Sequence, residues 1–351
     1  MNVPREPQQV LVVVLTIAIA ITGVWAASTS VPAFGVYNPG WEGASELRGE
    51  ATAANATPVV ATRVTEYDDV SPNRTVAVVL SPDRPYSDRE AARLRQFVQE
   101  GGMLVIAEDF GPHTNSLLLR VGASTRVDGQ LVRDEESFYR SPNLTVATGV
   151  SDSTLTEGVG QVTLNHGTVL EPYGARVLVE TSPFAYVDEN RNMSLDRDES
   201  MQTYPVVTAE EIGNGRVVTI SDPSVFINAM IERPGNERFA QALFAERSTV
   251  LLDYSHTASV PPLALALMLL RASPAMQGLV GLGLVGLVVL VSAQLPAVDA
   301  YRRNPEEMVP PPSRAEVRQR VARRHPEWDE ERIDRVIEGI ITNQEETQKD
   351  D

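Results

Sequence analysis

The chain has 351 residues, a formal net charge of −17 and no cysteine. The absence of cysteine excludes disulfides, thiol catalysis and thiolate metal sites. The charge balance, with Lys349 as the single lysine among 30 basic residues, argues against a nucleic-acid partner because an acidic surface repels phosphates.

The first apolar segment follows a short polar N-terminus, residues 1–9. Residues 10–27 form an uncharged apolar run of 18 residues, which is either a signal peptide ending near Ala26 and Ala27 or an uncleaved signal anchor. We favour the anchor because the run is long and has no polar region before a cleavage site. In both cases the segment that follows is exported.

The second apolar segment covers residues 275–295 and carries no formal charge over 21 residues. That length suffices for a transmembrane helix, and the arginines that follow it mark the cytoplasmic side. The two segments together predict a cell-membrane protein with two spans and both termini in the cytoplasm. Residues 28–261 would then form one domain outside the cell, and residues 262–274 an interfacial segment that approaches the second span.

Residues 28–261 begin with turn-forming residues, a helix expected over 44–54 and a strand over 57–65. The clearest local pattern follows. Residues 75–80 read as a buried strand, residues 87–100 as a helix with Ser87 as its N-cap, and residues 103–107 as another buried strand. A strand–helix–strand unit of this length predicts parallel pairing.

Short alternating segments between residues 125 and 187 predict an antiparallel extension of that sheet. A strand over 215–220 and helices over 113–121, 224–230 and 236–245 complete the domain. We therefore expect an α/β fold with a flavodoxin-like or amidotransferase-like parallel sheet, plus two transmembrane helices and a helical cytoplasmic tail. The tail, residues 296–351, is expected to form a helical pair over 313–342.

The sharpest motif is the loop of residues 188–199, in which side-chain oxygens recur at the spacing of an EF-hand calcium loop. Met193 departs from that pattern, since glycine is typical at the sharp turn, and a strand rather than a helix precedes the loop. The alternatives are a structural calcium site and a solvated acidic hairpin loop. The candidate ligands are Asp188, Asn190, Asn192, Ser194, Asp196 and Glu199.

Further candidate residues follow the predicted strands, because ligands of open α/β sheets bind beyond the carboxyl ends of the strands. Asp109, Asp222 and Ser224 are candidate ligand-binding residues there, although turn and N-cap roles explain the same residues. We identify no catalytic residues. Four Asn-X-Ser/Thr sequons make glycosylation a further expectation, at Asn55, Asn73, Asn143 and Asn192.

Three stretches carry a family resemblance: residues 37–43 (YNPGWEG), residues 97–102 (FVQEGG) and residues 213–228, which contain GRVV followed by SDPS. They resemble the haloarchaeal membrane proteins that carry domain of unknown function 4350. The arginine-rich acidic composition is also similar to that of haloarchaeal proteins. The domain is similar to the outer α/β domain of gliding-motility-type ABC-transporter auxiliary proteins, which is related to the class I amidotransferase fold without its catalytic residues.

The resemblance covers roughly residues 36–246 and implies an architecture and protein partners, namely a MoxR-type AAA+ ATPase and neighbouring membrane proteins. It implies no activity. We therefore expect a non-enzymatic, membrane-anchored accessory or scaffold protein with a ligand- or partner-binding outer domain and no cofactor other than a candidate calcium ion. The alternatives are an envelope hydrolase that uses Asp109 and Asp222, and a calcium-responsive sensor that acts through loop 188–199.

Overall fold

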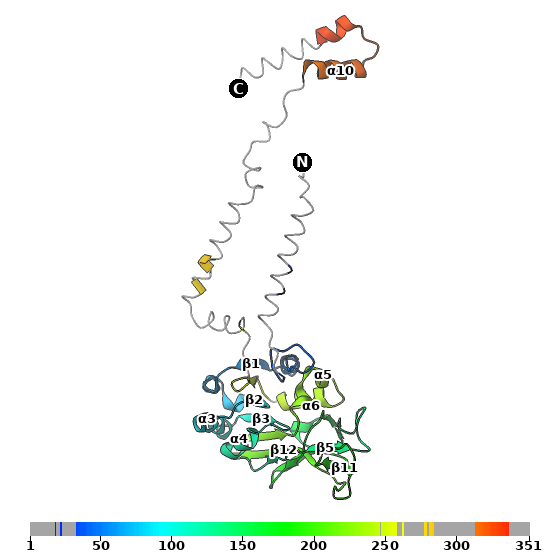
Figure 1. Cartoon of the computed structure of the whole chain (residues 1–351). Coiled ribbons are helices and arrows are strands. Elements are labelled where there is room, and N and C mark those ends of the chain that lie inside the picture. The colour runs from blue at the N-terminus through cyan, green and yellow to red at the C-terminus, as the bar shows by residue number, and fades with distance from the viewer. Residues whose placement is uncertain are drawn as a thin grey trace. The chain divides into compact units, whose positions relative to one another are not determined.

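The computed structural model describes residues 33–245, 247–257 and 313–336, with isolated positions at 18, 22, 262, 277–278 and 281–283. The chain divides into two compact units, Met1–Ala272 and Ser273–Asp351. Figure 1 shows the sheet and helices of the first unit and helix α10 of the second.

The first unit is built on an eight-stranded sheet with the order β1-β14-β2-β3-β13-β12-β10-β7. The first five strands in this order pair in parallel and the remaining pairs are antiparallel. The expectation of an α/β fold is therefore confirmed. The strands are β1 (Thr57–Ala61), β14 (Thr249–Asp253), β2 (Thr75–Leu80), β3 (Met103–Ala107), β13 (Gly215–Ile220), β12 (Pro205–Ile212), β10 (Arg176–Glu180) and β7 (Gly149–Val150).

The strand–helix–strand unit forms as its local signals predict. Strands β2 and β3 are buried throughout, and α3 (Asp88–Gln99) connects them. Ser87 and Glu90 form a reciprocal capping box at the start of α3, which satisfies two backbone donors of the first turn. The helix ends before Gly101, whose φ of 107° favours glycine.

Two hydrophobic cores lie on the two faces of the sheet. On one face, α3, α4 (Thr114–Val121) and the 3-10 helix η1 (Val64–Asp69) cover side chains such as Val79, Ile106 and Val217. On the other face, α2 (Leu47–Ala53) and α6 (Asn236–Phe244) pack over side chains such as Val78, Val105 and Val218. Alternate residues of each central strand thus enter opposite cores, as the pleat requires.

As predicted, the segment between α4 and β12 forms short strands, and two of them, β7 and β10, extend the central sheet in antiparallel pairing. Three two-stranded sheets lie here, which are β11 with β5, β4 with β9, and β6 with β8. Their bounds are β4 (Arg126–Val127), β5 (Leu131–Asp134), β6 (Val146–Ala147), β8 (Val162–Thr163), β9 (Leu170–Glu171) and β11 (Ala185–Asp188). The remaining elements of the unit are η2 (Pro72–Arg74), η3 (Thr154–Thr156), η4 (Pro223–Phe226) and α5 (Asn228–Ile231).

The prediction of two transmembrane helices is corrected. A helix needs about 20 consecutive apolar residues to cross a membrane, and among the described residues no helix is both long and apolar enough. This finding also overturns the predicted membrane localisation with both termini in the cytoplasm. Most of the two segments behind the prediction, 10–27 and 275–295, lies outside the described residues.

The described part of the second unit contains α10 (Arg314–Arg324), which starts at a capping box of Ser313 and Glu316. Helical residues resume at 330 and continue to 336. The rest of the predicted helical pair, 337–342, lies outside the described residues.

Candidate functional site

The carboxyl ends of β2, β3 and β13 bring polar side chains together at one edge of the sheet. The register pairs Ala107 of β3 with Leu80 of β2 and with Ile220 of β13. Continuing that register by two residues places Asp109 beside Asp222, and continuing it by one places Glu108 beside Ser81 and Ser221. The predicted pair of carboxyls is therefore assembled by the fold.

Glu108 is the centre of this edge. Its side chain is fully buried and accepts four hydrogen bonds. Oε1 accepts from the Ser81 hydroxyl at 3.1 Å and from the backbone N–H groups of Asp109 and Gly111 at 3.0 and 2.9 Å. Oε2 accepts from the Thr114 hydroxyl at 2.8 Å. The carboxylate thus joins β2, β3 and the start of α4.

Ser81 has a backbone conformation that is uncommon for a residue other than glycine. Its φ is 35°, in the left-handed region, at the point where the chain leaves β2. Such conformations cost about 1–3 kcal/mol and persist where the surrounding contacts fix them. The contact here is the hydrogen bond from the Ser81 hydroxyl to Glu108.

We predict that Ser81→Ala destabilises the domain by about 1–2 kcal/mol, whereas Ser81→Gly costs less. Both changes remove the hydrogen bond to Glu108, but only glycine adopts a positive φ without a steric penalty. Urea unfolding of the two variants measures the difference. Equal losses in both variants would show that the backbone at Ser81 stores no strain.

Asp222 is fully buried and serves as the N-cap of η4. Oδ1 accepts from the backbone N–H of Ser224 at 2.7 Å, and Oδ2 accepts from the backbone N–H of Asn165 at 2.5 Å. Burial raises the pKa of Asp222 to about 7, and the charge of Asp109 adds to that rise, while the two N–H groups oppose it. The side chain has no access to solvent through which a substrate could reach it.

Asp109 is partly exposed, and its Oδ1 accepts from the backbone N–H of Phe110 at 2.6 Å. Burial raises the pKa of Asp109 to about 6, the Phe110 N–H opposes this, and the adjacent Glu108 carboxyl contributes to the rise. Two neighbouring carboxyls in one weakly hydrated site disfavour double ionisation. The pKa values of Asp109 and Asp222 therefore both lie above the usual value of an aspartate.

Ser224, the third predicted ligand-binding residue, is a structural residue in this arrangement. It is buried, its N–H is bonded to Asp222, and its carbonyl accepts from the backbone N–H of Ile227 at 3.1 Å. The N-cap interpretation of this sequence is thus the one that the contacts support.

A second buried polar cluster lies at the carboxyl end of β14, and no sequence motif predicts it. Asp253 Oδ2 accepts from the hydroxyls of Tyr67 and Tyr86 at 2.9 and 3.0 Å. The His256 ring stacks on Tyr86 with centroids 3.7 Å apart, and its Nε2 lies 3.5 Å from Glu90 of α3. Residues so distant in sequence share no local pattern, so only the fold reveals the cluster.

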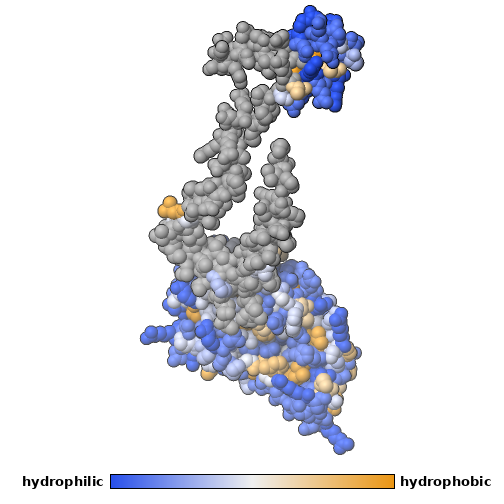
Figure 2. Space-filling view, turned by 45° about the horizontal axis from the view of Figure 1, so that its top comes forward, coloured by the Kyte–Doolittle hydropathy of each residue, from blue (hydrophilic) through white to orange (hydrophobic). Residues whose placement is uncertain are grey.

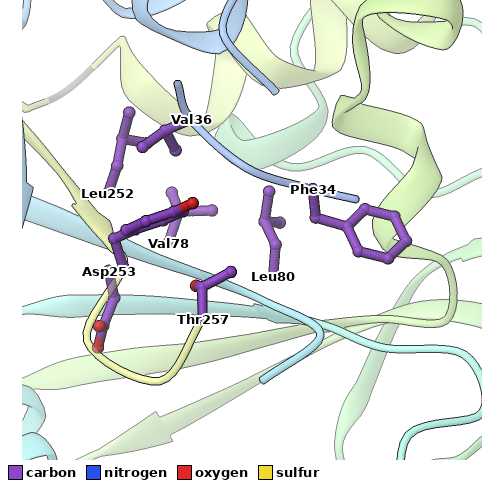
Figure 3. Close-up of a pocket in the computed structure, with 8 residues that line it drawn as sticks. Phe34, Val36, Val78, Leu80, Leu252, Asp253 and Thr257 are labelled. Atoms are coloured by element: carbon purple, nitrogen blue, oxygen red, sulfur yellow. The ribbon is translucent and has the colours of Figure 1, made fainter. Parts of the chain in front are cut away.

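A small cavity beside this cluster is too small for an organic ligand. It lies between the chain segment before α2 and the ends of β2 and β14, and Figure 3 shows its lining side chains. Its volume of about 10 Å³ corresponds to a single water molecule. The lining residues are Phe34, Val36, Val78, Leu80, Leu252, Asp253, Tyr254 and Thr257.

Loop 188–199 is closed by its own hydrogen bonds. Asp188 is fully buried and accepts from the backbone N–H groups of Asn192 and Met193 at 3.1 and 3.0 Å. The side chains of Asn190 and Asn192 both donate to Asp196 Oδ2 at 2.7 Å, and Glu199 accepts from the N–H of Asp196.

Calcium binding by the loop stays a prediction. In the part of the chain that the structure describes, no group of three or more Asp, Glu or His side chains is placed to hold a metal ion. One feature of the EF-hand pattern is nevertheless present, because Met193 has a φ of 66° at the position where glycine is typical. The carbonyl-ligand candidate Ser194 donates its N–H to Asn192 at 2.8 Å.

The four sequons differ in their surroundings. Asn55 and Asn73 are exposed, and Asn55 lies in a turn with a φ of 60°. The side-chain amide of Asn143 contacts the His166 ring, and that of Asn192 is bonded to Asp196. Glycosylation of all four residues stays a prediction.

Comparison with known proteins identifies one family. The model of the domain of unknown function DUF4350 matches residues 36–244. No curated protein matches the sequence.

Solved structures give only distant similarity, with TM-scores below 0.5. The N-terminal domain of mmIFT52 has a TM-score of 0.41 and 13% identity over 52% of this chain and 80% of that one. The exo-β-1,4-mannosidase Op5Man5 from Opitutaceae bacterium strain TAV5 has a TM-score of 0.29 and 16% identity over 49% of this chain and 25% of that one. The β-galactosidase of the haloarchaeon Halorubrum lacusprofundi has a TM-score of 0.30 and 15% identity over 58% of this chain and 27% of that one.

These likenesses carry no argument about function. The family match, in contrast, spans more than half of the chain and contains every strand of the central sheet except β14, together with the carboxyl edge with Glu108, Asp109 and Asp222. The chain therefore belongs to the DUF4350 family.

Proposed function

We propose that this protein is a non-enzymatic accessory or scaffold protein whose α/β domain binds a protein partner. The observation that carries the proposal is the filled carboxyl edge of the sheet, where α/β proteins bind small ligands. Asp222 and Glu108 are fully buried there, and each is bonded to groups of the domain itself. The cavity of about 10 Å³ beside Asp253 is too small for a metabolite, since ligand pockets measure about 300–1,000 Å³. A larger hollow of about 370 Å³ lies beside Glu90 and Ser255, and none of Glu108, Asp109 and Asp222 lines it.

The same observations argue against a hydrolase that uses Asp109 and Asp222. Two carboxyls that act as acid and base must both reach the scissile bond. Asp222 is instead fully buried, and its Oδ2 accepts a hydrogen bond from the backbone N–H of Asn165 at 2.5 Å. The face of the domain that Figure 2 shows is mostly hydrophilic with scattered apolar areas.

The family resemblance suggests the first partners to test, an AAA+ ATPase and the proteins encoded beside it. The full-length tagged protein is purified from extracts of its native host, and the proteins that accompany it are identified by mass spectrometry. Recovery of the same partners by wild type and by Asp109→Asn, which keeps the side-chain volume, supports the proposal. A hydrolytic activity of the purified protein that Asp109→Asn abolishes would overturn it.

A second candidate function is calcium binding by loop 188–199, and the positive φ of Met193 favours it. The loop backbone already makes the sharp turn of a calcium loop, and the buried Asp188 carboxylate stands at its first position. Binding would require the Asn190 and Asn192 amides to turn their oxygens toward the ion, which an amide rotation achieves. The ion would stabilise the connection between β11 and β12.

Calcium binding predicts that excess Ca²⁺ stabilises the wild-type protein by about 2–3 kcal/mol, because a ligand that binds only the folded state adds stability by mass action. Thermal unfolding with Ca²⁺ and with Mg²⁺ measures the effect. Asp196→Asn should remove the response, whereas Asp198→Asn, a loop carboxyl outside the ligand pattern, should retain it. An equal response of both variants would show that the ions act on surface charge alone.

A further inference from the structure

The tail hairpin, defined here as residues 313–336, has an unusual separation of charge. Helix α10 carries five arginines and one glutamate over 11 residues, a net charge of +4. Residues 327–334, with the sequence EWDEERID, carry five acidic side chains and one arginine, a net charge of −4. The two halves are therefore complementary in a chain whose overall charge is −17.

Within one hairpin, only some of the basic side chains of α10 form ion pairs with the acidic segment. Arg318 Nη2 lies 3.9 Å from Glu330 Oε2, and Arg318 Nε lies 3.5 Å from Asp334 Oδ1. Arg320, Arg323 and Arg324 are exposed and form no ion pair with any residue that the structure describes in the hairpin or elsewhere. Arg320 lies close enough to Glu316 of the same helix to lower the pKa of that carboxyl. Arg323 and Arg324 have no acidic partner among the residues that the structure describes.

The turn between the two helices is well fixed. The His325 and Trp328 rings stack with centroids 4.0 Å apart, and the Arg332 guanidinium lies 4.9 Å from the centre of the Trp328 ring. The capping box at Ser313 fixes the start of α10. A charged surface held in place in this way can select a partner by its pattern of charge.

The apolar core of the hairpin is small. Ile333 is buried, whereas Val317, Val321, Trp328 and Val336 are only partly covered in the described part of the unit. Partly covered apolar side chains stabilise a structure when association removes them from water. Two-helix hairpins achieve this when two copies form a four-helix bundle.

We propose that the tail hairpin pairs with the tail hairpin of a second copy of this chain. In a two-fold arrangement each surface meets its counterpart reciprocally, so α10 of one copy faces the acidic 327–334 segment of the other, and the same contact occurs twice. The half-covered valines and Trp328 are buried between the copies. The proposal concerns the second unit and is independent of the partner-binding role of the α/β domain.

The test uses charge reversal in the full-length protein, followed by sedimentation at about 50 µM, a concentration that populates dimers of micromolar affinity. The wild type is expected to sediment as a dimer. Arg320→Glu with Arg324→Glu, and separately Glu327→Arg with Glu331→Arg, should each weaken self-association by at least about tenfold because like charges then face each other. An equimolar mixture of the two double variants should restore a heterodimer.

The matched control is Arg89→Glu with Arg95→Glu on α3, which changes the net charge of the chain as much as the first double variant does. These side chains are exposed and lie in the other unit, so this control should remain dimeric. A monomeric wild type, dimers that survive both reversals, or a mixture that stays monomeric would each overturn the proposal. Binding of RNA by the wild type but not by Arg320→Glu with Arg324→Glu, without self-association, would overturn it in favour of a phosphate partner.

Discussion

Replacing Glu108 by alanine is expected to cost at least about 4 kcal/mol of unfolding free energy, enough to unfold a domain of ordinary stability. The carboxylate is the acceptor for two hydroxyls and two backbone N–H groups at the ends of β2 and β3. The hydroxyls of Ser81 and Thr114 can rotate to other acceptors, but the N–H groups of Asp109 and Gly111 cannot. Each buried donor left unpaired costs about 1–3 kcal/mol, and the vacated volume adds a cavity term.

Glu108→Gln is the matched control and is expected to cost only about 1 kcal/mol. The amide oxygen can take the place of Oε1, which accepts three of the four bonds. The amide nitrogen then faces the Thr114 hydroxyl, which can act as an acceptor. Urea unfolding of both variants measures the difference. If glutamine cost as much as alanine, the negative charge of Glu108, rather than its hydrogen bonds, would be the stabilising feature.

The part of the fold that the sequence predicts well is the part with strong local signals. Strands β2 and β3 are continuous apolar runs, and the helix between them has a capping box at its start and two glycines at its end. The strand predicted over 57–65 was too long. Strand β1 ends at Ala61 because residues 64–69 turn into the 3-10 helix that brings the Tyr67 hydroxyl to Asp253. The two residues of that contact are 186 positions apart in the sequence, so no local sequence pattern predicts it.

The sequence predicted where the candidate site lies but not that Asp222 is buried there. The rule that parallel strands end at one edge was sufficient to bring Asp109 and Asp222 together. It could not show that Asn165, in the antiparallel insertion, covers Asp222 and converts a candidate ligand site into an interior one. The buried role of Glu108 could not be predicted for the same reason, since its partners Ser81, Gly111 and Thr114 come from three separate segments.

The largest pH effect is expected from Asp222. A rise of its pKa from 3.8 to about 7 on folding corresponds to about 4 kcal/mol. Because the folded-state pKa is the higher one, the folded protein binds the proton more tightly than the unfolded chain does. This contribution to stability is therefore fully present below pH 3.8 and is lost as the pH rises through about 7. Asp109, with a pKa raised to about 6, acts in the same direction as part of the same pair.

Asp222→Asn should flatten this pH dependence. At pH 4 the variant is expected to be less stable than the wild type by about 1–2 kcal/mol, because one amide oxygen cannot accept from both Asn165 and Ser224. At pH 8 the wild type must bury a charge beside Asp109, whereas the variant does not, so the two stabilities should converge or cross. Urea unfolding between pH 4 and 8 measures both curves, with Asp83→Asn, an exposed carboxyl at the same edge of the sheet, as the control. Parallel curves for Asp222→Asn and the wild type would mean that Asp222 is ionised throughout this range and that its two backbone N–H bonds outweigh its burial.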